Sequence, residues 1–512
     1  MNIFKKRKNK SLLKSDSQPN PVTNSIVFSS INENLNYIKN RLNQTVDFKT
    51  QQIINSDVLI AYIETMVDKK SIQQKIIEPL FQQLLKNNDL TESIQNIIHF
   101  DMKEVSILSA AIDNLINGST LLLMDVPPFI LSIETQNTEK RAITEPTSEK
   151  VIRGPHDGFI EDLNTNINLI RKQIRNPNLT VRNFTLGTEI KTKVSLIYIE
   201  DLASSDLLDE IDRRIKAISK DYAVPSCYLE EYIQDSKLSP FPQILNTERP
   251  DRVVGNLSEG RAILMEENNP NALILPVTFF AFYQSPDDYN SRWGVGSFFR
   301  LLRILSFFIA VGLPALYIAV ISFHFEVLPD ELLTPIKSSI QGIPYPPIIE
   351  ALIMELTIEL IREAGIRLPT TISQTIGIVG GLVIGDAVVK VGLISNTMII
   401  VVALTAIASF VVPSSEMSNS VRLLRFPFMV AAATGGFIGM AFTFMILLTH
   451  LCKLESFGTP YFAPLAPFHL KGLKDSIIKA PVWQLAKEQS NTQPKEPEQQ
   501  SYTKKGEQND DN

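Results

Sequence analysis

The chain has 512 residues, of which 44% are hydrophobic and 20% charged, and its formal net charge is −6. This length predicts roughly two to four domains. A net charge so small, without a basic stripe interleaved with aromatic residues, argues against a nucleic-acid partner. The two cysteines, Cys227 and Cys452, lie far apart, so neither a disulfide framework nor a metal site is expected.

The first segment, 1–30, is rich in Ser, Asn, Gln, Lys and Pro and is predicted to be a disordered basic tail. Its lysines and arginine are either simply solvated or attracted to anionic membrane lipid. No apolar stretch of signal-peptide length follows them. The soluble part of the chain is therefore expected to stay in the cytoplasm.

Two similar α/β subdomains are predicted next, at 31–149 and 150–290. Residues 58–64 (VLIAYIE) match residues 194–200 (VSLIYIE), although a chance match between two buried strands would look the same. Apolar spacing in each subdomain alternates between the helical and the strand period. The expected helices are 31–42, 72–85, 105–116, 159–174 and 205–218, and the expected strands are 45–54, 58–66, 120–124, 129–134, 179–186 and 191–199.

Residues 291–452 are predicted to form an all-α transmembrane domain, because apolar runs of about 20 residues are long enough to cross a bilayer. The runs lie at 301–323, 372–394, 397–412 and 426–452. Basic and aromatic residues flank both ends of the region, which favours cytoplasmic ends and four spans. Arg422 and Arg425 then fall in an outer loop. A five-span model relieves that conflict but moves the C-terminal lysines outside.

The segment 348–367 is expected to be an amphipathic helix after a run of prolines. Glu355, Glu359 and Glu363 lie on one stripe of it, with Arg362 beside them. Such a helix can lie in the membrane interface, pack on the soluble domain, or line a water-filled path. Acidic stripes of this kind can select cations, so these glutamates are candidate pore-lining residues.

The predicted second span carries an ionisable pair, Asp386 and Lys390, spaced i, i+4. Charge in a span is costly and indicates function, either as part of an ion pathway or as a buried structural pair. Small residues in this span and in the last one repeat every fourth position, which favours close helix packing and an oligomer. The packing glycines are Gly377, Gly381, Gly385, Gly435 and Gly439.

The remaining segment, 453–512, is predicted to be a cytoplasmic tail that begins with a proline-punctuated stretch and ends in disorder. The sequence contains no phosphate-binding glycine loop and no Gly-x-Ser-x-Gly, and its histidines do not cluster. The chain is therefore not expected to be an enzyme, and no cofactor is expected.

Several distinctive motifs lie between about 150 and 467. They are RGPHDGFIE at 153–161, PFP at 240–242 with ERP at 248–250, PPIIEALIME at 346–355, IGIVGGLVIGD at 376–386, VPSSE at 412–416 and SFGTPYFAP at 456–464. In their order and combination they closely resemble the A subunits of the GerA family of spore germinant receptors. The first 150 residues and the tail carry much less of the match.

The resemblance implies a multi-pass, non-enzymatic protein of the spore inner membrane that acts in spore germination. It implies two partners, a transporter-like B subunit thought to bind the nutrient germinant and a lipoprotein C subunit. It also implies a homo-oligomeric ring that releases monovalent cations when nutrient is sensed.

Two functions of different classes follow. The first is a nutrient-gated cation channel subunit, in which the glutamate stripe lines the pore and Asp386–Lys390 acts as a gate or assembly pair. The second is a non-conducting scaffold that couples the nutrient-binding subunit to a separate channel. A free-standing transporter fits less well, since the membrane part shows few spans and no inverted repeat.

Overall fold

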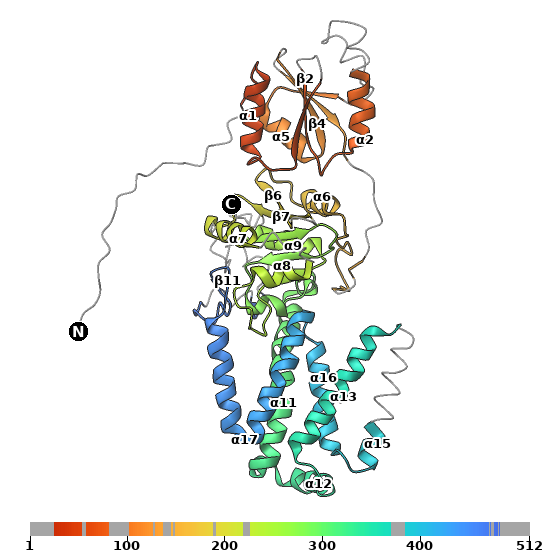
Figure 1. The fold of residues 1–512 in the computed structure, drawn as a ribbon, viewed down its shortest axis with the longest axis vertical. Helices are drawn as coiled ribbons and strands as arrows, with labels where there is room; N and C mark the ends of the chain where they lie inside the picture. Colours follow the sequence, from red (N-terminus) through yellow and green to blue (C-terminus); the bar gives the residue numbers. More distant parts are fainter. Residues whose placement is uncertain are drawn as a thin grey trace, which may run out of the picture. The chain divides into compact units, whose positions relative to one another are not determined.

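The computed structural model describes residues 25–53, 58–80, 102–125, 129–136, 145–146, 149–187, 191–218, 226–369, 385–469, 472, 476–479 and 481. They fall into two compact units (Figure 1). The first holds residues up to 139 together with 175–177, and the second holds 140–174 and everything from 178 onward.

The first unit is an antiparallel sheet with helices on both faces. Its strands lie in the order β1-β2-β4-β5-β3. Helices α1 and α5 pack on one face, and the α2 segment packs on the other. The elements are α1 (Ile31–Arg41), β1 (Phe48–Gln52), β2 (Val58–Ile63), α2 (Lys69–Ile72), a π-helical turn (Gln73–Ile77), β3 (Met102–Val105), α5 (Leu108–Ile116), β4 (Ser119–Met124) and β5 (Ile130–Glu134).

The second unit begins with a sheet of the same topology, in the order β6-β7-β9-β10-β8. Helices α6 and α9 cover one face, and α7 and α8 cover the other. The elements are α6 (Leu163–Gln173), β6 (Leu179–Leu186), β7 (Thr192–Ile199), α7 (Ser205–Ala217), α8 (Ser226–Ile233), β8 (Leu245–Thr247), α9 (Pro250–Ser258), β9 (Ala262–Glu266) and β10 (Ala272–Leu275).

The two sheets confirm the predicted pair of similar α/β subdomains. The matching heptapeptides occupy equivalent strands, β2 and β7, each second in its sheet. Alternate residues of β7 enter different cores, with Leu196 on one side and Ile197 on the other, as the two-residue period of a strand requires. Strands β3, β8, β9 and β10 were not predicted. In particular, β3 and β8 are too short to show a period.

A helical region follows the second sheet in the same unit. A 3₁₀ turn (Phe279–Tyr283) and α10 (Pro286–Asn290) lead into it. Its elements are α11 (Trp293–Phe323), a 3₁₀ turn (Phe325–Val327), α12 (Asp330–Ile340), α13 (Pro347–Arg367), α15 (Gly385–Lys390), α16 (Asn396–Phe410), α17 (Ser415–Lys453) and the hairpin strands β11 (Glu455–Ser456) and β12 (Thr459–Pro460).

Within the described residues, two helices, α11 and α17, are long and apolar enough to cross a membrane, and α16 is a shorter apolar helix. The prediction of four spans is therefore not confirmed. Most of the expected span at 372–394 lies outside the described residues.

Helix α17 folds back on itself, so the prediction of one straight span over 426–452 is wrong. Its backbone breaks at Gly436, where φ is 57° and ψ is −137°. Ser420 Oγ, before the break, donates to the carbonyl oxygen of Pro240. After the break, His450 Nε2 lies 2.9 Å from Ser239 Oγ. A straight helix would separate residues 420 and 450 by about 45 Å.

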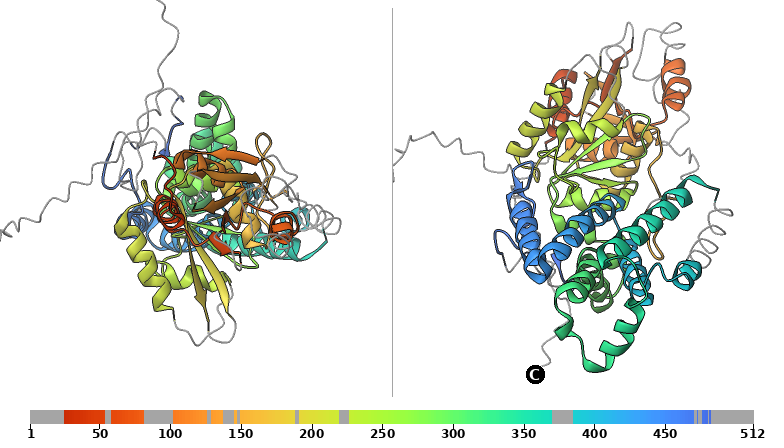
Figure 2. Two further views of the ribbon diagram at one scale, coloured as in Figure 1. Left: turned by 90° about the horizontal axis from the view of Figure 1, so that it is seen from above. Right: turned by 60° about the horizontal axis from the view of Figure 1, so that its bottom comes forward.

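The fold-back gives α17 two arms, 415–435 and 437–453, visible as separate blue helices (Figures 1 and 2). Because both arms reach the 239–240 segment, Arg422 lies at the sheet end of the helical region.

We predict that Gly436→Ala destabilises the protein, whereas Gly435→Ala does not. A Cβ at position 436 would lie 2.9 Å from His324 Nε2 on a backbone with positive φ, while a Cβ at position 435 meets nothing within 4 Å. Such a conformation costs a non-glycine residue ~1–3 kcal/mol. Thermal unfolding of both variants in detergent measures the difference, and an equal effect of the two substitutions would contradict the assigned bend.

Candidate functional site: the charged helices and the joint with the second sheet

The acidic stripe of α13 begins at a buried ion pair. Glu355 Oε2 accepts a hydrogen bond from Arg425 Nη1 of α17, and the two side chains are only 1% and 3% exposed. Arg425 Nε also donates to the carbonyl oxygen of Ala310 in α11, at 3.0 Å. Burying either charge alone would be costly. The pair therefore ties α13, α11 and the first arm of α17 together.

The other two glutamates of the stripe are progressively more exposed. Glu359 Oε2 accepts from Arg362 Nε at 2.6 Å, and its second oxygen lies 3.4 Å from Arg422 Nε. Glu363 pairs with Arg367 of the same helix at 2.7 Å, and both side chains are exposed. In the single chain the stripe is thus a ladder of ion pairs. Its role as a pore lining stays a prediction.

A further buried carboxylate, Glu350, lies in the first turn of α13. It is 0% exposed, and its Oε2 accepts from the backbone N–H of Ser395 at 3.0 Å. Ser395 is the N-cap of α16, and its hydroxyl lies 3.1 Å from Tyr317 Oη. The positive end of the α16 dipole stabilises the carboxylate. Sequence reasoning missed this role because Glu350 lies off the acidic stripe.

The ionisable pair of the expected second span is described only in part. Asp386 and Lys390 belong to α15, but the side chain of Asp386 lies outside the described residues, and Lys390 is exposed. Gly377 and Gly381 also lie outside the described residues, and so do the surroundings of Gly385. The pair and the glycine stripe of this span stay predictions.

The glycines of the last helix serve its bend more directly than contact with another helix. A Cβ at Gly439 would collide with the carbonyl oxygen of Ala431, in the other arm of α17, whereas Gly435 faces open space. Gly436, which was not predicted, lies against His324, whose ring stacks on Phe437 with centroids 4.5 Å apart. The adjacent pair of glycines was the available signal for a bend.

The proline-rich segment 239–242 joins the second sheet to both arms of α17. This segment bonds to Ser420 and His450, and the carbonyl oxygen of its Pro242 also accepts a hydrogen bond from Tyr461 Oη at 2.7 Å. The ring of Phe241 stacks on His450, with centroids 6.0 Å apart. These contacts fix the ends of α17 to the soluble subdomain.

A second joint lies where α10 enters α11. Asp288 is 1% exposed, and its Oδ2 accepts from Arg303 Nη1 at 2.6 Å, with Arg300 Nε 3.6 Å away. Lys479, from the segment after the hairpin, donates to the carbonyl oxygens of Asp288, Tyr289 and Ser291 at 2.7–3.0 Å. The first long helix is thus also anchored by buried charge.

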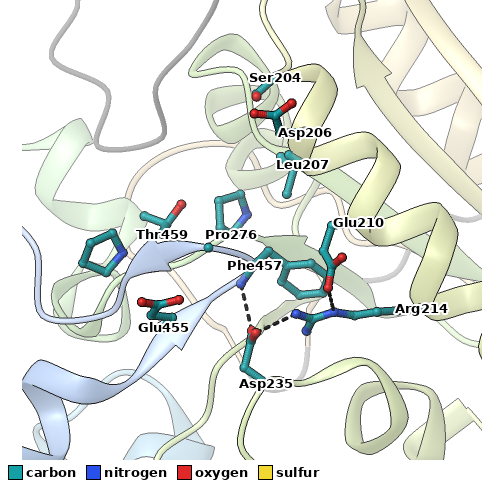
Figure 3. Close-up of a pocket in the computed structure, with 12 residues that line it drawn as sticks. Ser204, Asp206, Leu207, Glu210, Arg214, Asp235, Pro276, Glu455, Phe457 and Thr459 are labelled. Carbon is teal, nitrogen blue, oxygen red and sulfur yellow. Dashed lines mark hydrogen bonds and ion pairs between the residues drawn. The ribbon is translucent and has the colours of Figure 1, made fainter. Parts of the chain in front are cut away.

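A pocket of about 470 Å³ lies between α7 and the hairpin that follows α17 (Figure 3). The guanidinium of Arg214 lies 4.3 Å from the ring centre of Phe457 and pairs with Glu210 at 2.7 Å and Asp235 at 2.6 Å. The amide of Phe457 donates to Asp235 Oδ2 at 2.8 Å. Arg214 therefore holds the tip of the hairpin against the soluble subdomain.

Electrostatic interactions at this pocket favour contact between the hairpin and the soluble subdomain. Hydrogen bonds from Arg213, and then from Arg214, outweigh desolvation and together lower the pKa of Glu210 to about 2, so this carboxylate stays ionised at neutral pH. The other carboxylates that line the pocket, Asp206 and Glu455, make its wall acidic.

Two carboxylates interact where α8 meets the start of α17: Glu230 of α8 and Glu416 of α17. Burial, with a smaller contribution from the charge of Glu416, raises the pKa of Glu230 to about 8. Close to neutral pH, Glu230 therefore retains its proton. Repulsion between the two carboxylates weakens the α8–α17 contact whenever both are ionised.

The motif loop 153–161 packs on the segment 248–251. Arg249 is 0% exposed, pairs with both oxygens of Asp251 at 3.0 and 2.8 Å, and donates to the carbonyl oxygen of Pro155 at 2.9 Å. Pro250 occupies the first turn of α9, a position that proline favours. These residues build the subdomain.

Fold and site together define a class of protein in which hydrogen bonds and ion pairs attach a soluble α/β subdomain to a set of apolar helices. These helices carry buried ion pairs of their own. The family model of the Bacillus/Clostridium GerA spore germination protein matches residues 36–491. The chain therefore belongs to the GerA spore germination protein family.

Individual relatives agree with this assignment. Spore germination protein KA of Bacillus subtilis (strain 168) is 40% identical, over 83% of this chain and 78% of that protein. Spore germination protein A1 of the same organism is 38% identical, over 92% and 98%. A crystal structure of the N-terminal domain of the A subunit of the Bacillus megaterium spore germinant receptor GerK3 is 30% identical, covers 50% of this chain and 98% of that chain, and has a TM-score of 0.40.

We predict that Arg214→Gln releases the hairpin, because it removes both ion pairs and the cation–π contact. Amide hydrogen exchange at Phe457 should speed up in the variant. Lys216→Gln is the matched control, since Lys216 lies on the same helix and its ion pair with Asp212 lies near the surface. Equal exchange at Phe457 in both variants would show that Arg214 does not hold the hairpin.

Glu230 gives a prediction for pH. Its folded pKa of about 8 lies above the ordinary value of ~4.3. As pH rises between these two values, the unfolded chain loses the proton while the folded chain keeps it. The free energy of unfolding therefore falls, by at most ~1.4 kcal/mol per pH unit. Glu230→Gln should reduce this fall between pH 5 and 8, as measured by thermal unfolding, and an unchanged slope would refute the assignment.

Proposed function

We propose that this chain is the A subunit of a nutrient germinant receptor and that it forms, as a homo-oligomer in the spore inner membrane, part of a nutrient-gated cation pathway. A transporter-like B subunit and a lipoprotein C subunit are its proposed partners. Membership of the spore germination family supports the receptor role. The charges of the helical region support the pathway.

The observation that carries the proposal is the graded ladder on α13. It runs from Glu355, which is buried, through Glu359 to Glu363, which is exposed. Carboxylates at successive depths offer a cation successive sites. The same helix exposes large apolar side chains, with Leu356 and Leu360 59% and 62% exposed. A neighbouring copy or lipid would cover these side chains.

Charge distribution supports an orientation with the soluble subdomains in the cytoplasm. Three basic residues lie at the sheet end of the helical region. They are Arg303 at the start of α11, Arg422 in the first arm of α17 and Lys453 at the end of the second arm. Basic residues favour the cytoplasmic side. Asp386 and Lys390 are proposed as a gate or assembly pair. Gly435, where a Cβ would meet nothing within 4 Å among the described residues, is proposed as a contact between copies, together with Gly377, Gly381 and Gly385.

A second candidate function is a non-conducting adaptor that passes a signal from the nutrient-binding subunit to a separate channel. The joints favour it, because the 239–242 segment, Asp288 and Arg214 each bond the soluble subdomain to a different part of the helical region. In this role the glutamate ladder would serve only to hold the helices together.

Substitutions along the ladder separate the two functions. Glu363→Gln should reduce nutrient-triggered release of K⁺ from spores and leave folding intact, because the ion pair of Glu363 with Arg367 of its own helix is exposed. Glu355→Gln should instead lower stability by ~3–5 kcal/mol, since it leaves Arg425 buried without its counter-charge.

Glu331→Gln, at an exposed glutamate of α12, is the matched control and should change neither property. Potassium release, protein abundance in spores and thermal unfolding in detergent are the readouts. Normal K⁺ release from spores that contain a wild-type amount of the Glu363→Gln protein would remove that residue from the pathway and favour the adaptor.

A further inference from the structure

Two loops of the second α/β subdomain expose a large aliphatic side chain almost completely. Leu238 is 98% exposed and Ile152 is 95% exposed, while the next most exposed large hydrophobic residue in the described part of the chain is Val391, at 72%. Single exposed apolar residues are common on protein surfaces, so exposure alone does not define a site. The position of the two loops in the fold sets them apart.

Each loop is bonded to an end of the long apolar helices. Leu238 directly precedes Ser239 and Pro240, which bond to the second and the first arm of α17. The backbone N–H of Ile152 donates to Asp287 Oδ1 of α10 at 3.2 Å, and α10 leads into α11. Both loops therefore lie at the sheet end of the helical region, where the proposed membrane begins.

The apolar surface that a bilayer would cover on α11 extends up to the second loop. Trp293, the first residue of α11, is 53% exposed, and Phe298 and Leu305 further along are 62% and 54% exposed. Just before the helix, Asn290 Nδ2 donates to the carbonyl oxygen of Arg153 at 2.8 Å. The loop that carries Ile152 is thus fixed where this exposed apolar surface starts.

A basic residue and an aromatic residue accompany each exposed aliphatic side chain. In the first loop, Lys237 is exposed, and its Nζ lies 5.7 Å from the ring centre of Tyr232, which is 47% exposed. In the second loop, Arg153 is exposed, and Trp293 begins the adjoining helix. Basic residues attract anionic lipid, aromatic rings favour the membrane–water interface, and aliphatic side chains insert at the boundary between headgroups and acyl chains.

We propose that the two loops anchor the second subdomain to the surface of an anionic bilayer. Leu238 and Ile152 enter the boundary between lipid headgroups and acyl chains, and Lys237 and Arg153 bind the anionic headgroups. A protein partner suits such isolated side chains less well, because the core of a protein interface is a contiguous apolar patch. The inference rests on the proposed membrane location of the helices, but it does not require ion conduction.

The test places a spin label at Ile152→Cys or Leu238→Cys in the full chain, with Cys227 and Cys452 replaced by serine. The chain is reconstituted in liposomes of phosphatidylcholine and phosphatidylglycerol. Power-saturation EPR then compares the access of oxygen, which dissolves in the bilayer, with that of a water-soluble nickel chelate. Labels at both positions should be more accessible to oxygen than to the chelate, as expected at the headgroup level.

Two further labels make the result decisive. Thr185→Cys carries the same label at an exposed position of β6, the edge strand opposite β8, and should be more accessible to the chelate. Phe308→Cys, at a half-exposed position of α11, reports whether the helices are inserted and should strongly favour oxygen.

The four labels separate the possible failures. If position 308 is inserted but 152 and 238 behave like 185, the anchoring proposal is wrong and the membrane location stands. If position 308 favours the chelate, the membrane location fails together with the anchoring. Labels at 152 and 238 that are shielded from both reagents would indicate a protein partner and would also overturn the proposal.

A charge variant tests the contact with the headgroups. Lys237→Gln, combined with the label at position 238, should weaken anchoring to the anionic liposomes about fivefold and so lower the preference for oxygen. In liposomes of phosphatidylcholine alone it should have little effect. Lys193→Gln is the matched control, because Lys193 is an exposed lysine of β7 that lies opposite Thr185 in the sheet. An equal response to the two substitutions would show that Lys237 does not bind anionic lipid.

Discussion

Both ends of the longest helix are held by one short proline-rich segment of the soluble subdomain. Ser420 and His450 reach residues 239–240 from opposite ends of α17, which is possible only because the backbone reverses at Gly436. The reversal brings the hairpin at Phe457 back to the sheet, so the hairpin pocket depends on it.

Buried charge in the helical region is stabilised by partners from different helices. Glu355 pairs with Arg425, and Glu350 receives the N-terminus of α16. Such groups are costly to bury singly, so they bind the helices into one set. A cation path through this set would require those ion pairs to exchange their partners, and the anchored ends of α11 and α17 offer the soluble subdomain a means to drive that exchange.

Sequence periodicity predicted the two α/β subdomains, the helix at 348–367 and the glutamate stripe, since these depend on residues close together in the chain. It did not predict β3, β8, β9 and β10, and of these the two edge strands β3 and β8 are too short to show a period. Nor did it predict the bend at Gly436, because continuous apolar residues look alike in one long helix and in two arms. The partner of Glu355, Arg425, comes from a distant segment of the chain, which a pattern of residue types does not report.

The most direct test of the central claim is ion flux in liposomes that hold the purified chain, alone and then with its proposed B and C subunits. The account predicts a monovalent cation leak that depends on this chain and that, in the complete receptor, responds to nutrient. A well-folded oligomer that conducts no cations, even with both partners and nutrient present, would contradict the pathway and leave the adaptor role.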